Sequence, residues 1–336
     1  MLIAAREETL RLVETFTIAN SSVDTETVCV LTLEHDGITA YGEGAPVDYW
    51  GENAGGIVAA LEADGLALLG DDPWALERIA ARLRAWDGPQ GAKMALDGAV
   101  HDWVGKRAAL PVWRLLGLDP VTPETSFTIG IDTVEGTRSR VERAARFGVL
   151  KVKVGGASDL ERLEAVRAAT GARLRIDANE GWTLDTAIAL LPRLVELGVE
   201  FVEQPFPAND RASYRAYRAL EPRLPVLIDE GCRDLASIAE IKTYADGIVI
   251  KLSKCGGIRE ALRMIHAARA LGLAVMLGCM IESELGIAQA AQLGSLVDYV
   301  DLDGHLLIEA GLFRGLGLEA GRLVLSGAPG LGVVPG

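Results

Sequence analysis

A repeating unit of about 25 residues runs from Ser126 to Gly304 and constrains the fold more than any other feature of the sequence. Each unit opens with a short apolar, β-branched run and continues as an amphipathic helical stretch, as in LRIDAN followed by TLDTAIALLPRLVELG. The eight runs recur at intervals of 22 to 27 residues, marked by Thr128, Val152, Ile176, Phe201, Leu227, Val249, Met276 and Asp301. Eight strands joined by single helices predict a closed parallel barrel of the α/β class.

No amphipathic helix follows the eighth run. The sequence becomes rich in glycine there, as in GLFRGLGLEAGRL. The predicted barrel is therefore a modified, TIM-like (β/α)7β barrel, and we expect it to span residues 121–317.

The first 120 residues have another pattern, which predicts an α+β capping domain over residues 1–120. Alternating strand-like runs come first, and Asp36-Gly37 between them is a hairpin signal. Helical stretches follow at Asn53–Leu69, Trp74–Leu83 and Ala92–Leu116. We expect the end of the chain, residues 318–336, to return to this domain.

Composition excludes several classes of partner. The formal net charge of −14 argues against nucleic-acid binding, which needs a basic face. No stretch approaches the roughly 18 uncharged apolar residues of a membrane span. Four scattered cysteines without metal-like spacing indicate reduced thiols, so we expect a cytoplasmic protein. The sequence does not define an oligomeric state and leaves a homo-oligomer open.

Acidic residues end three successive predicted strands. Asp177, Glu203 and Asp229 are spaced 26 and 26 residues apart, so they occupy equivalent places on neighbouring strands. Carboxylates aimed at one point repel one another unless a cation lies between them. Oxygen ligands without nearby His or Cys favour a hard cation, and we therefore expect Mg²⁺.

Lysines occupy the second and sixth predicted strands. Lys151 and Lys153 alternate with valines, so both are expected to face the barrel lumen. Lysine beside another cation has a lowered pKa, and we expect Lys151 to have this effect on Lys153. Lys251 ends the sixth strand after the uncharged run GIVI, whereas Lys254 is expected to reach solvent.

The positions of these strands around the ring indicate a mechanism. Strands two and six face each other in a ring of eight, with the three acids on the arc between them. A substrate carboxylate bound to the metal would hold its α-carbon between the amines of Lys153 and Lys251. One amine would remove a proton and the other would return it to the opposite face, which is the geometry of a racemase or epimerase.

Several segments carry a resemblance to a known family. KVKVGG, RIDANEGW, VEQPF, LIDEG and IVIKLSKCGG resemble the signature segments of the muconate-lactonizing subgroup of the enolase superfamily, and the turn YGEGAP extends the likeness to the first domain. A lysine or histidine base with magnesium is the general chemistry of that superfamily. The resemblance implies metal ligands at Asp177, Glu203 and Asp229, an acid/base pair at Lys153 and Lys251, assistance from Lys151, and supporting contacts from Asn179 and Glu230.

Two further segments are similar to those of dipeptide epimerases. They are GCMIES after the seventh strand and DLDGH after the eighth. Asp301 and Asp303 would then face the α-ammonium of a dipeptide whose carboxylate holds the metal. The same likeness implies substrate contacts from Thr128, Val23, Met280, Ile281 and Glu282.

The loop after the first strand departs from the family pattern. Family members that act on alanyl-glutamate tend to carry a basic residue there, but residues 19–26 of this chain contain no Lys or Arg. This departure favours apolar substrate side chains over glutamate.

Other readings share part of these features. N-acylamino acid racemase, o-succinylbenzoate synthase and cycloisomerase use the same lysines and metal, but none requires an acidic pair for an ammonium. Relatives with a histidine base after the seventh strand are disfavoured, since LAVMLGCMIES contains none. A non-enzymatic, metal-stabilised binding barrel would leave the two lumen lysines unexplained.

Overall fold

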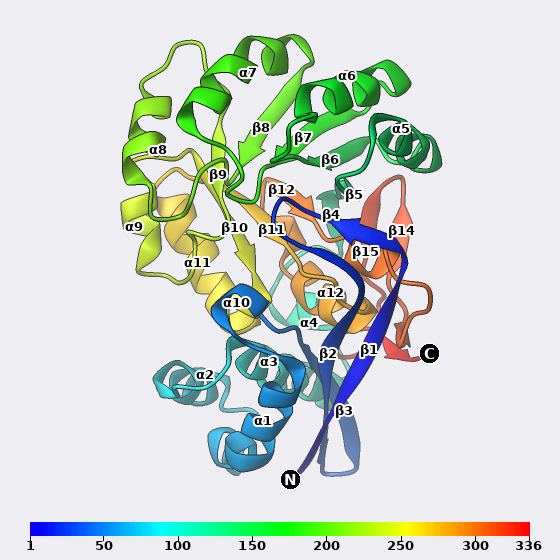
Figure 1. Ribbon diagram of the computed structural model, residues 1–336. Helices are drawn as coiled ribbons and strands as arrows, with labels where there is room; N and C mark the ends of the chain where they lie inside the picture. The colour runs from blue at the N-terminus through cyan, green and yellow to red at the C-terminus, as the bar shows by residue number, and fades with distance from the viewer.

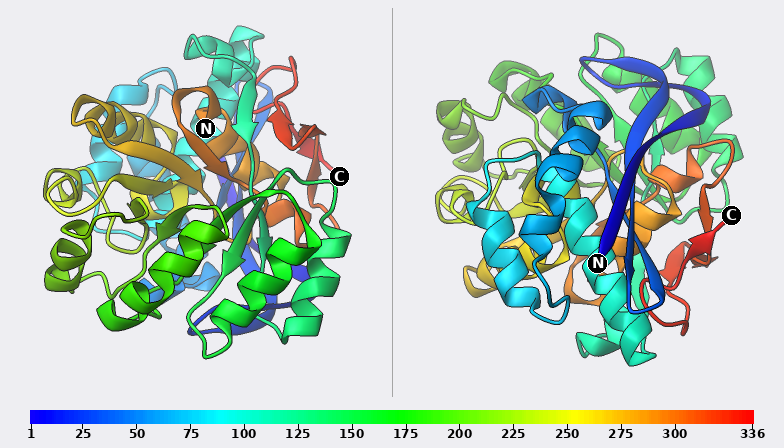
Figure 2. Two further views of the ribbon diagram at one scale, coloured as in Figure 1. Left: turned by 90° about the horizontal axis from the view of Figure 1, so that it is seen from above. Right: turned by 90° about the horizontal axis from the view of Figure 1, so that it is seen from below.

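The computed structural model describes all residues from 1 to 336 and shows a barrel with a second, N-terminal part against one end (Figure 1). In Figure 2 this N-terminal part, blue to cyan, lies behind the barrel from above and in front of it from below. No helix has the length and apolar character that crossing a bilayer requires.

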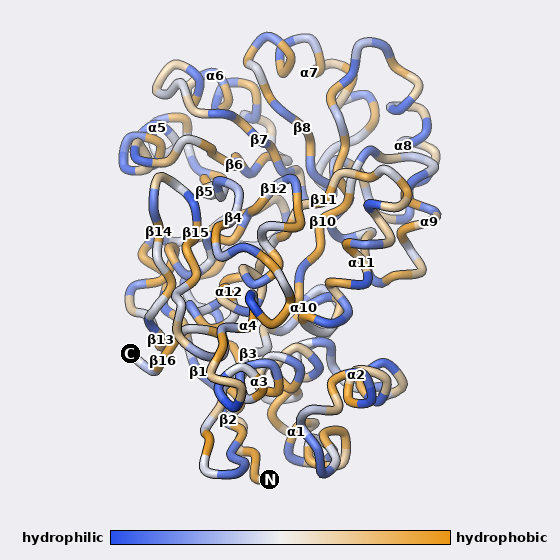
Figure 3. The backbone as a smooth tube through the Cα atoms, turned by 180° about the vertical axis from the view of Figure 1, so that it is seen from behind, coloured by the Kyte–Doolittle hydropathy of each residue, from blue (hydrophilic) through white to orange (hydrophobic).

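The barrel consists of eight parallel strands in sequential order from β5 to β12. A bridge between Thr125 and Val300 links its first and last strands, and the Ser126 N–H donates to the Val300 carbonyl at 3.0 Å. Figure 3 shows the mainly apolar character of β10 and β11. The strands are β5 (Phe127–Ile129), β6 (Val149–Lys153), β7 (Arg173–Asp177), β8 (Val199–Glu203), β9 (Val226–Ile228), β10 (Gly247–Lys251), β11 (Ala274–Gly278) and β12 (Tyr299–Asp301).

Seven helical connections join these strands, and the predicted (β/α)7β architecture is confirmed. In α7, Ala187, Leu191 and Leu194 are buried at helical spacing, which gives the helix one apolar face toward the barrel. After β12 the only helical element is the short turn η3 (Gly304–Leu306). The connecting helices are α5 (Val134–Arg143), α6 (Asp159–Ala169), α7 (Leu184–Glu196), α8 (Arg211–Arg218), α9 (Ser237–Ile241), α10 with α11 (Leu252–Cys255, Ile258–Ala270) and α12 (Glu284–Ala291, followed by the turn η2, Gly294–Leu296).

The N-terminal part is a three-stranded antiparallel sheet with helices on one side. Its strands are β1 (Leu2–Thr17), β2 (Ser22–His35) and β3 (Ile38–Gly44). The predicted hairpin at Asp36-Gly37 is confirmed, and both residues have the positive φ angles, 48° and 73°, of a tight two-residue turn. After the turn η1 (Asp48–Trp50), helices α1 (Ala54–Leu69), α2 (Leu76–Ala85) and α3 (Gln90–Ala108) follow.

One predicted helix is interrupted. The stretch Ala92–Leu116 was expected to be continuous, but α3 ends at Ala108 and a short helix α4 covers Val112–Leu115. Ala109 adopts a left-handed conformation with φ of 54°, and Pro111, which has no N–H, lies just before α4. These two residues end the first helix and start the second.

The C-terminal segment contacts both parts of the molecule. Strands β14 (Gly317–Glu319) and β15 (Arg322–Val324) form a small sheet with β4 (Val121–Glu124), and β13 (Phe313–Arg314) pairs with β16 (Val334–Pro335). The Leu331 N–H donates to Asp102 of α3 at 2.8 Å. The division of the chain at residues 120 and 317 stays a prediction.

Candidate active site

Strand register brings the predicted site residues to one end of the barrel. Lys153 pairs with Asp177 across β6 and β7, and Asp177 pairs with Glu203 across β7 and β8. Asp229 directly follows β9, and Lys251 is the last residue of β10. Because all strands run in parallel, these residues lie together at their carboxyl ends.

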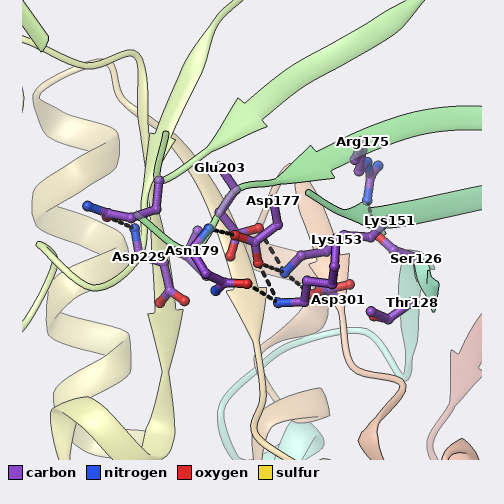
Figure 4. A network of polar contacts seen from close by, with 12 residues as sticks. Ser126, Thr128, Lys151, Lys153, Arg175, Asp177, Asn179, Glu203, Asp229 and Asp301 are labelled. Atoms are coloured by element: carbon purple, nitrogen blue, oxygen red, sulfur yellow. Dashed lines mark hydrogen bonds and ion pairs between the residues drawn. The ribbon is translucent and has the colours of Figure 1, made fainter. Parts of the chain in front are cut away.

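Asp177 lies at the centre of the polar network (Figure 4). Its Oδ2 lies 2.6 Å from Lys153 Nζ and 3.0 Å from Lys151 Nζ. Burial alone would raise the pKa of Asp177, but these two ammonium groups hold it well below its usual range. Asp177 is therefore ionised at neutral pH.

Glu203 is fully buried, and neither carboxylate oxygen has a hydrogen-bond partner. Lys151 Nζ approaches Oε2 to 2.9 Å without hydrogen-bond alignment. Burial raises the pKa of Glu203 well above its ordinary value, and repulsion from Asp177 adds to this effect. Buried polar groups usually have a hydrogen-bond partner, and the Glu203 carboxylate has none.

Asp229 pairs with two lysines, Lys251 and Lys254. The predicted position of Lys254 is wrong. Lys251 Nζ lies 2.8 Å from Asp229 Oδ2, which agrees with the predicted position of Lys251 at the end of its strand. Lys254 was expected to reach solvent, but it is only 1% exposed and its Nζ lies 2.5 Å from Oδ1. Strand alternation does not apply to Lys254 because α10 begins at Leu252, immediately after β10.

Neighbouring carboxylates raise the pKa values of Lys151 and Lys251. Burial lowers the pKa of Lys151, but Asp177, Asp301 and Glu203 together raise it well above its ordinary value. For Lys251, burial is likewise outweighed, chiefly by the carboxylate of Asp229. The carboxylates around these two amines therefore outweigh the effect of burial on their pKa values.

The three acids at the carboxyl ends of β7, β8 and β9 fit Mg²⁺ by donor chemistry. They offer only oxygen ligands, and the two unpartnered oxygens of Glu203 are the groups that a cation would satisfy. As they stand, no three Asp, Glu, His or Cys side chains are arranged in a coordination geometry. Lysine ammonium groups contact the acids instead, and both Lys151 and Lys153 form ion pairs with Asp177.

A cavity of about 390 Å³ opens over this network. Lys151, Lys153 and Lys251 all line it. Lys153 and Lys251, which come from opposed strands, therefore face one space. The capping domain supplies much of the remaining wall, including Tyr49. Its neighbour Trp50 does not line the cavity. The guanidinium of Arg233 lies over the Trp50 ring instead, 4.4 Å from the ring centroid.

Asp301 and Asp303 also line the cavity. Asp301 Oδ2 accepts a hydrogen bond from Lys151 Nζ at 2.7 Å, while its Oδ1 is buried without a partner. Asp303 Oδ2 accepts from the Thr128 N–H at 2.6 Å, which orients the carboxylate and places Thr128 beside it. Burial raises the pKa of Asp303 to about 7, with a contribution from Asp301.

The other predicted substrate contacts divide into two groups. Val23, Met280 and Ile281 line the cavity. Glu282 does not line it, because its side chain is buried and accepts a hydrogen bond from the Met280 N–H at 2.9 Å. The structure therefore does not place Glu282 where it could contact a substrate.

Asn179 and Glu230 support the lysine and the acids. Asn179 Oδ1 accepts from Lys153 Nζ at 3.1 Å, and its Nδ2 donates to Glu230 Oε1 at 3.1 Å. Burial raises the pKa of Glu230 to about 7, with a further contribution from Asp229. Lys153 is thus held between Asp177 and Asn179.

Sequence reasoning missed two acids that the capping domain contributes to the cavity wall, Glu26 and Asp48. Glu26 lies at the end of the loop already noted for its lack of basic residues. Asp48 begins the turn η1, and no local pattern indicates that this turn faces the barrel. Only the packing of the two domains reveals that both acids share the cavity.

Fold and site together define a class of barrel proteins that combine three strand-end carboxylates with lysines on opposed strands. The family model "Enolase C-terminal domain-like" matches residues 134–335, and "Mandelate racemase / muconate lactonizing enzyme, N-terminal domain" matches residues 3–117. The chain belongs to this enolase-superfamily family, as its signature segments predicted.

Similar proteins carry names from one branch of the family. An L-Ala-D/L-Glu epimerase of Bacteroides thetaiotaomicron is 38% identical, with 97% of this chain and 85% of the relative covered. A substrate-liganded L-Ala-D/L-Glu epimerase structure from Bacillus subtilis has a TM-score of 0.93 at 28% identity, covering 100% and 98%. A dipeptide epimerase from Methylococcus capsulatus, complexed with Mg and L-Arg-D-Lys, has a TM-score of 0.92 at 33% identity, covering 99% and 98%.

Proposed function

We propose that this protein is a Mg²⁺-dependent dipeptide epimerase that inverts the α-carbon next to the dipeptide carboxylate. The observation that carries the proposal is the single cavity that contains Lys153 and Lys251, which come from strands four places apart in the barrel. Similarity to dipeptide epimerases over nearly the whole chain supports the same conclusion.

The two lysines perform the proton transfer. One of them, as a free amine, takes the α-proton from one face of the substrate, and the other, as an ammonium, gives a proton to the opposite face. The C–H bond broken and the C–H bond formed involve the same carbon, so no oxidant or second substrate is needed. The reverse reaction exchanges the two roles.

Asp177, Glu203 and Asp229 would hold the metal. When bound, Mg²⁺ supplies charge stabilisation for a substrate carboxylate as the neighbouring α-carbon loses its proton. Lys151 lies against Asp177, Glu203 and Asp301, so it fixes these carboxylates relative to one another. Asn179 and Glu230 orient Lys153 through the hydrogen bonds described above.

Asp301 and Asp303 would bind the α-ammonium of the dipeptide. The unpartnered Oδ1 of Asp301 is a buried acceptor in the cavity wall, and an ammonium is the group that would satisfy it. N-acylated amino acids have no such charge. This pair therefore favours a dipeptide over the substrate of an N-acylamino acid racemase.

We also propose a cytoplasmic location, since all four cysteines are free and three of them are buried thiols, as in a reducing compartment. Association of copies into a homo-oligomer stays a prediction that light scattering would test.

A comparison of free and N-acetylated dipeptides tests the proposed function. With Mg²⁺ present, α-deuteration of L-Ala-L-Leu in D₂O should be faster than that of its N-acetyl form by about one to two orders of magnitude in kcat/KM, because acetylation removes a charge-assisted hydrogen bond. Asp303→Asn should weaken the free dipeptide more than the acetylated one. A preference for the acetylated compound would instead assign the protein to the N-acylamino acid racemases.

A further inference from the structure

A second cavity, of about 210 Å³, lies at the junction of the capping domain and the barrel. It shares no lining residue with the catalytic cavity described above. Helices α2 and α3 line one side, and α10, α11 and the loop after β9 line the other (Figure 1). Its wall concentrates positive charge in a chain whose formal net charge is −14. Five basic residues line it, namely Arg84, Lys93, Arg233, Lys254 and Arg259.

Lys93 of α3 is a buried cation without a partner. It lines the second cavity, is only 8% exposed and forms neither a hydrogen bond nor an ion pair. Burial lowers the pKa of Lys93, and the attraction of Asp87, Glu52 and Glu260 offsets this only in part. A buried ammonium group without a counter-charge is costly, so a bound anion would stabilise it.

Arg233 is a second cation of this cavity without a counter-charge. It lies in the loop after β9 and forms no hydrogen bond and no ion pair. Its guanidinium lies over the Trp50 ring, 4.4 Å from the centroid. Stacking on an aromatic ring orients the plane of a guanidinium and leaves the N–H donors at its edge available. Lys93 and Arg233 therefore offer donors to one cavity from two different domains.

The other three basic residues already contact carboxylates. The pairs are Lys254 with Asp229, Arg259 with Glu77, and Arg84 with Glu260. Only the last pair is loose, because Arg84 Nη1 and Glu260 Oε2 are 3.8 Å apart. The charges that a ligand would neutralise are therefore those of Lys93 and Arg233, and Arg84 adds to their attraction for an anion.

The three acids of the wall, Asp97, Asp234 and Glu260, are bound to other donors. Asp97 accepts the N–H of Ile258 at 2.6 Å, Asp234 accepts the N–H of Ser237 at 2.9 Å, and Glu260 Oε2 lies 2.7 Å from Arg263 Nη1. None of these acids forms an ion pair with either of the two unpaired cations. The wall thus leaves two positive charges to a ligand.

We propose that this second cavity binds a small phosphoryl compound, whose phosphate oxygens pair with Lys93 and Arg233. Ammonium and guanidinium groups are the side chains that bind phosphate in proteins. A phosphoryl group carries nearly two negative charges at pH 7, which matches two unpaired cations. Because one cation belongs to the capping domain and the other to the barrel, the bound ligand also links the two domains. The site is independent of the proposed epimerase activity.

Calorimetric titration of the whole chain, with Mg²⁺ present and at constant ionic strength, tests this site. The probes are inorganic phosphate and glycerol 3-phosphate, with acetate for comparison. We expect one equivalent of a phosphoryl compound to bind at least about tenfold more tightly than acetate. Tighter binding of glycerol 3-phosphate would identify a phosphate ester as the ligand, and tighter binding of inorganic phosphate would identify the free ion. Binding of acetate as tight as that of both phosphoryl compounds, or no saturable binding, would overturn the proposal.

Substitutions assign the binding to the second cavity. Lys93→Gln and Arg233→Gln should each weaken phosphate binding by about tenfold, since each removes one charge-assisted hydrogen bond. Lys93→Arg keeps the charge and should retain most of the affinity. Arg138→Gln is the matched control for Arg233→Gln, because Arg138 is exposed and lines neither cavity. Arg233 is exposed as well, so its loss tests the site even if Lys93→Gln does not fold.

A variant of the catalytic cavity separates the two possible locations of the anion. Lys153→Ala removes a cation from the catalytic cavity and should keep the phosphate affinity of the wild type. If Lys153→Ala abolishes binding, or if Arg233→Gln binds phosphate as tightly as Arg138→Gln, the anion does not occupy the second cavity and the proposal is wrong.

Discussion

Lys153 and Lys251 show how much of a site depends on individual side chains held from several directions. Lys153 is fixed by Asp177 and Asn179, and Lys251 by Asp229. Gly278 also matters, because a Cβ at that position would lie 3.3 Å from Lys251 Cε. Each amine is therefore restricted to one approach to the cavity, as a two-base mechanism requires.

Single lysine substitutions should separate the two half-reactions. Lys251→Ala should lower epimerisation by about two to four orders of magnitude but still exchange the α-proton of the one epimer that faces Lys153. Lys153→Ala should show the opposite preference. Deuterium incorporation into each pure epimer, followed by mass spectrometry, measures this.

The control for this experiment is Lys242→Ala. Lys242 contacts only the carbonyl of Gly272 at 3.4 Å, at an exposed site, so this variant should exchange both epimers like the wild type. Equal exchange of both epimers by a variant at Lys153 or Lys251 would contradict the two-base assignment.

At the scale of elements, the close packing of α3 on β3 holds the capping domain together. Gly42 and Gly44 of β3 face the α3 backbone, and a Cβ on Gly42 would lie 2.0 Å from the Ala95 carbonyl oxygen. Helix and strand can approach this closely only because these two positions have no side chain. The same sheet carries Glu26 into the cavity.

Gly42→Ala should therefore destabilise the protein. The added methyl group meets backbone atoms that cannot rotate away, so we expect the free energy of unfolding to fall by about 1–3 kcal/mol or more. Urea unfolding followed by circular dichroism measures this change. Gly171→Ala, where a Cβ would meet nothing within 4 Å, should stay within about 0.5 kcal/mol of wild type. Similar midpoints for both variants would refute the packing account.

At the scale of the whole molecule, a buried acidic pair joins the capping domain to the barrel. Glu43 of β3 accepts the Ser283 N–H at 2.9 Å, and its own N–H donates to Gln289 Oε1 at 2.7 Å. Burial raises the pKa of Glu43 to about 7. Burial and the nearby Glu43 raise the pKa of Glu282 to about 8. Two carboxyl groups at the domain junction are thus costly to ionise.

This pair predicts a pH dependence of stability. An unfolded glutamate has a pKa of about 4.3, so the folded protein binds these protons more tightly. Their contribution to stability is present below about pH 4 and is lost as pH rises to about 8. Between pH 5 and 8.5 the free energy of unfolding of Glu282→Gln should therefore fall less than that of wild type, by about 2–4 kcal/mol.

Urea unfolding of wild type and Glu282→Gln at several pH values measures the difference between the two curves. Glu34→Gln serves as the control, since Glu34 is exposed and should leave the pH dependence as it is in the wild type. Parallel curves for wild type and Glu282→Gln would show that this carboxyl group titrates normally in the folded protein.

Local periodicity and regular spacing determined much of this protein from its sequence. The strand period predicted the (β/α)7β barrel, because each strand-and-helix unit needs a nearly constant length to close the ring. The same spacing predicted that Asp177, Glu203 and Asp229 share one end of the barrel and that Lys153 and Lys251 lie on opposed strands. Parallel strands leave little freedom in these placements.

Tertiary structure alone decided the features that depend on contacts between distant segments. Lys254 turned inward to Asp229 because a helix starts directly after β10, and Glu282 turned to the domain junction and away from the cavity. Glu26 and Asp48 became part of the cavity only when the capping domain packed on the barrel. No local pattern records such contacts, since they arise from the packing of whole elements whose sequence separation exceeds 200 residues in the case of Glu43 and Gln289.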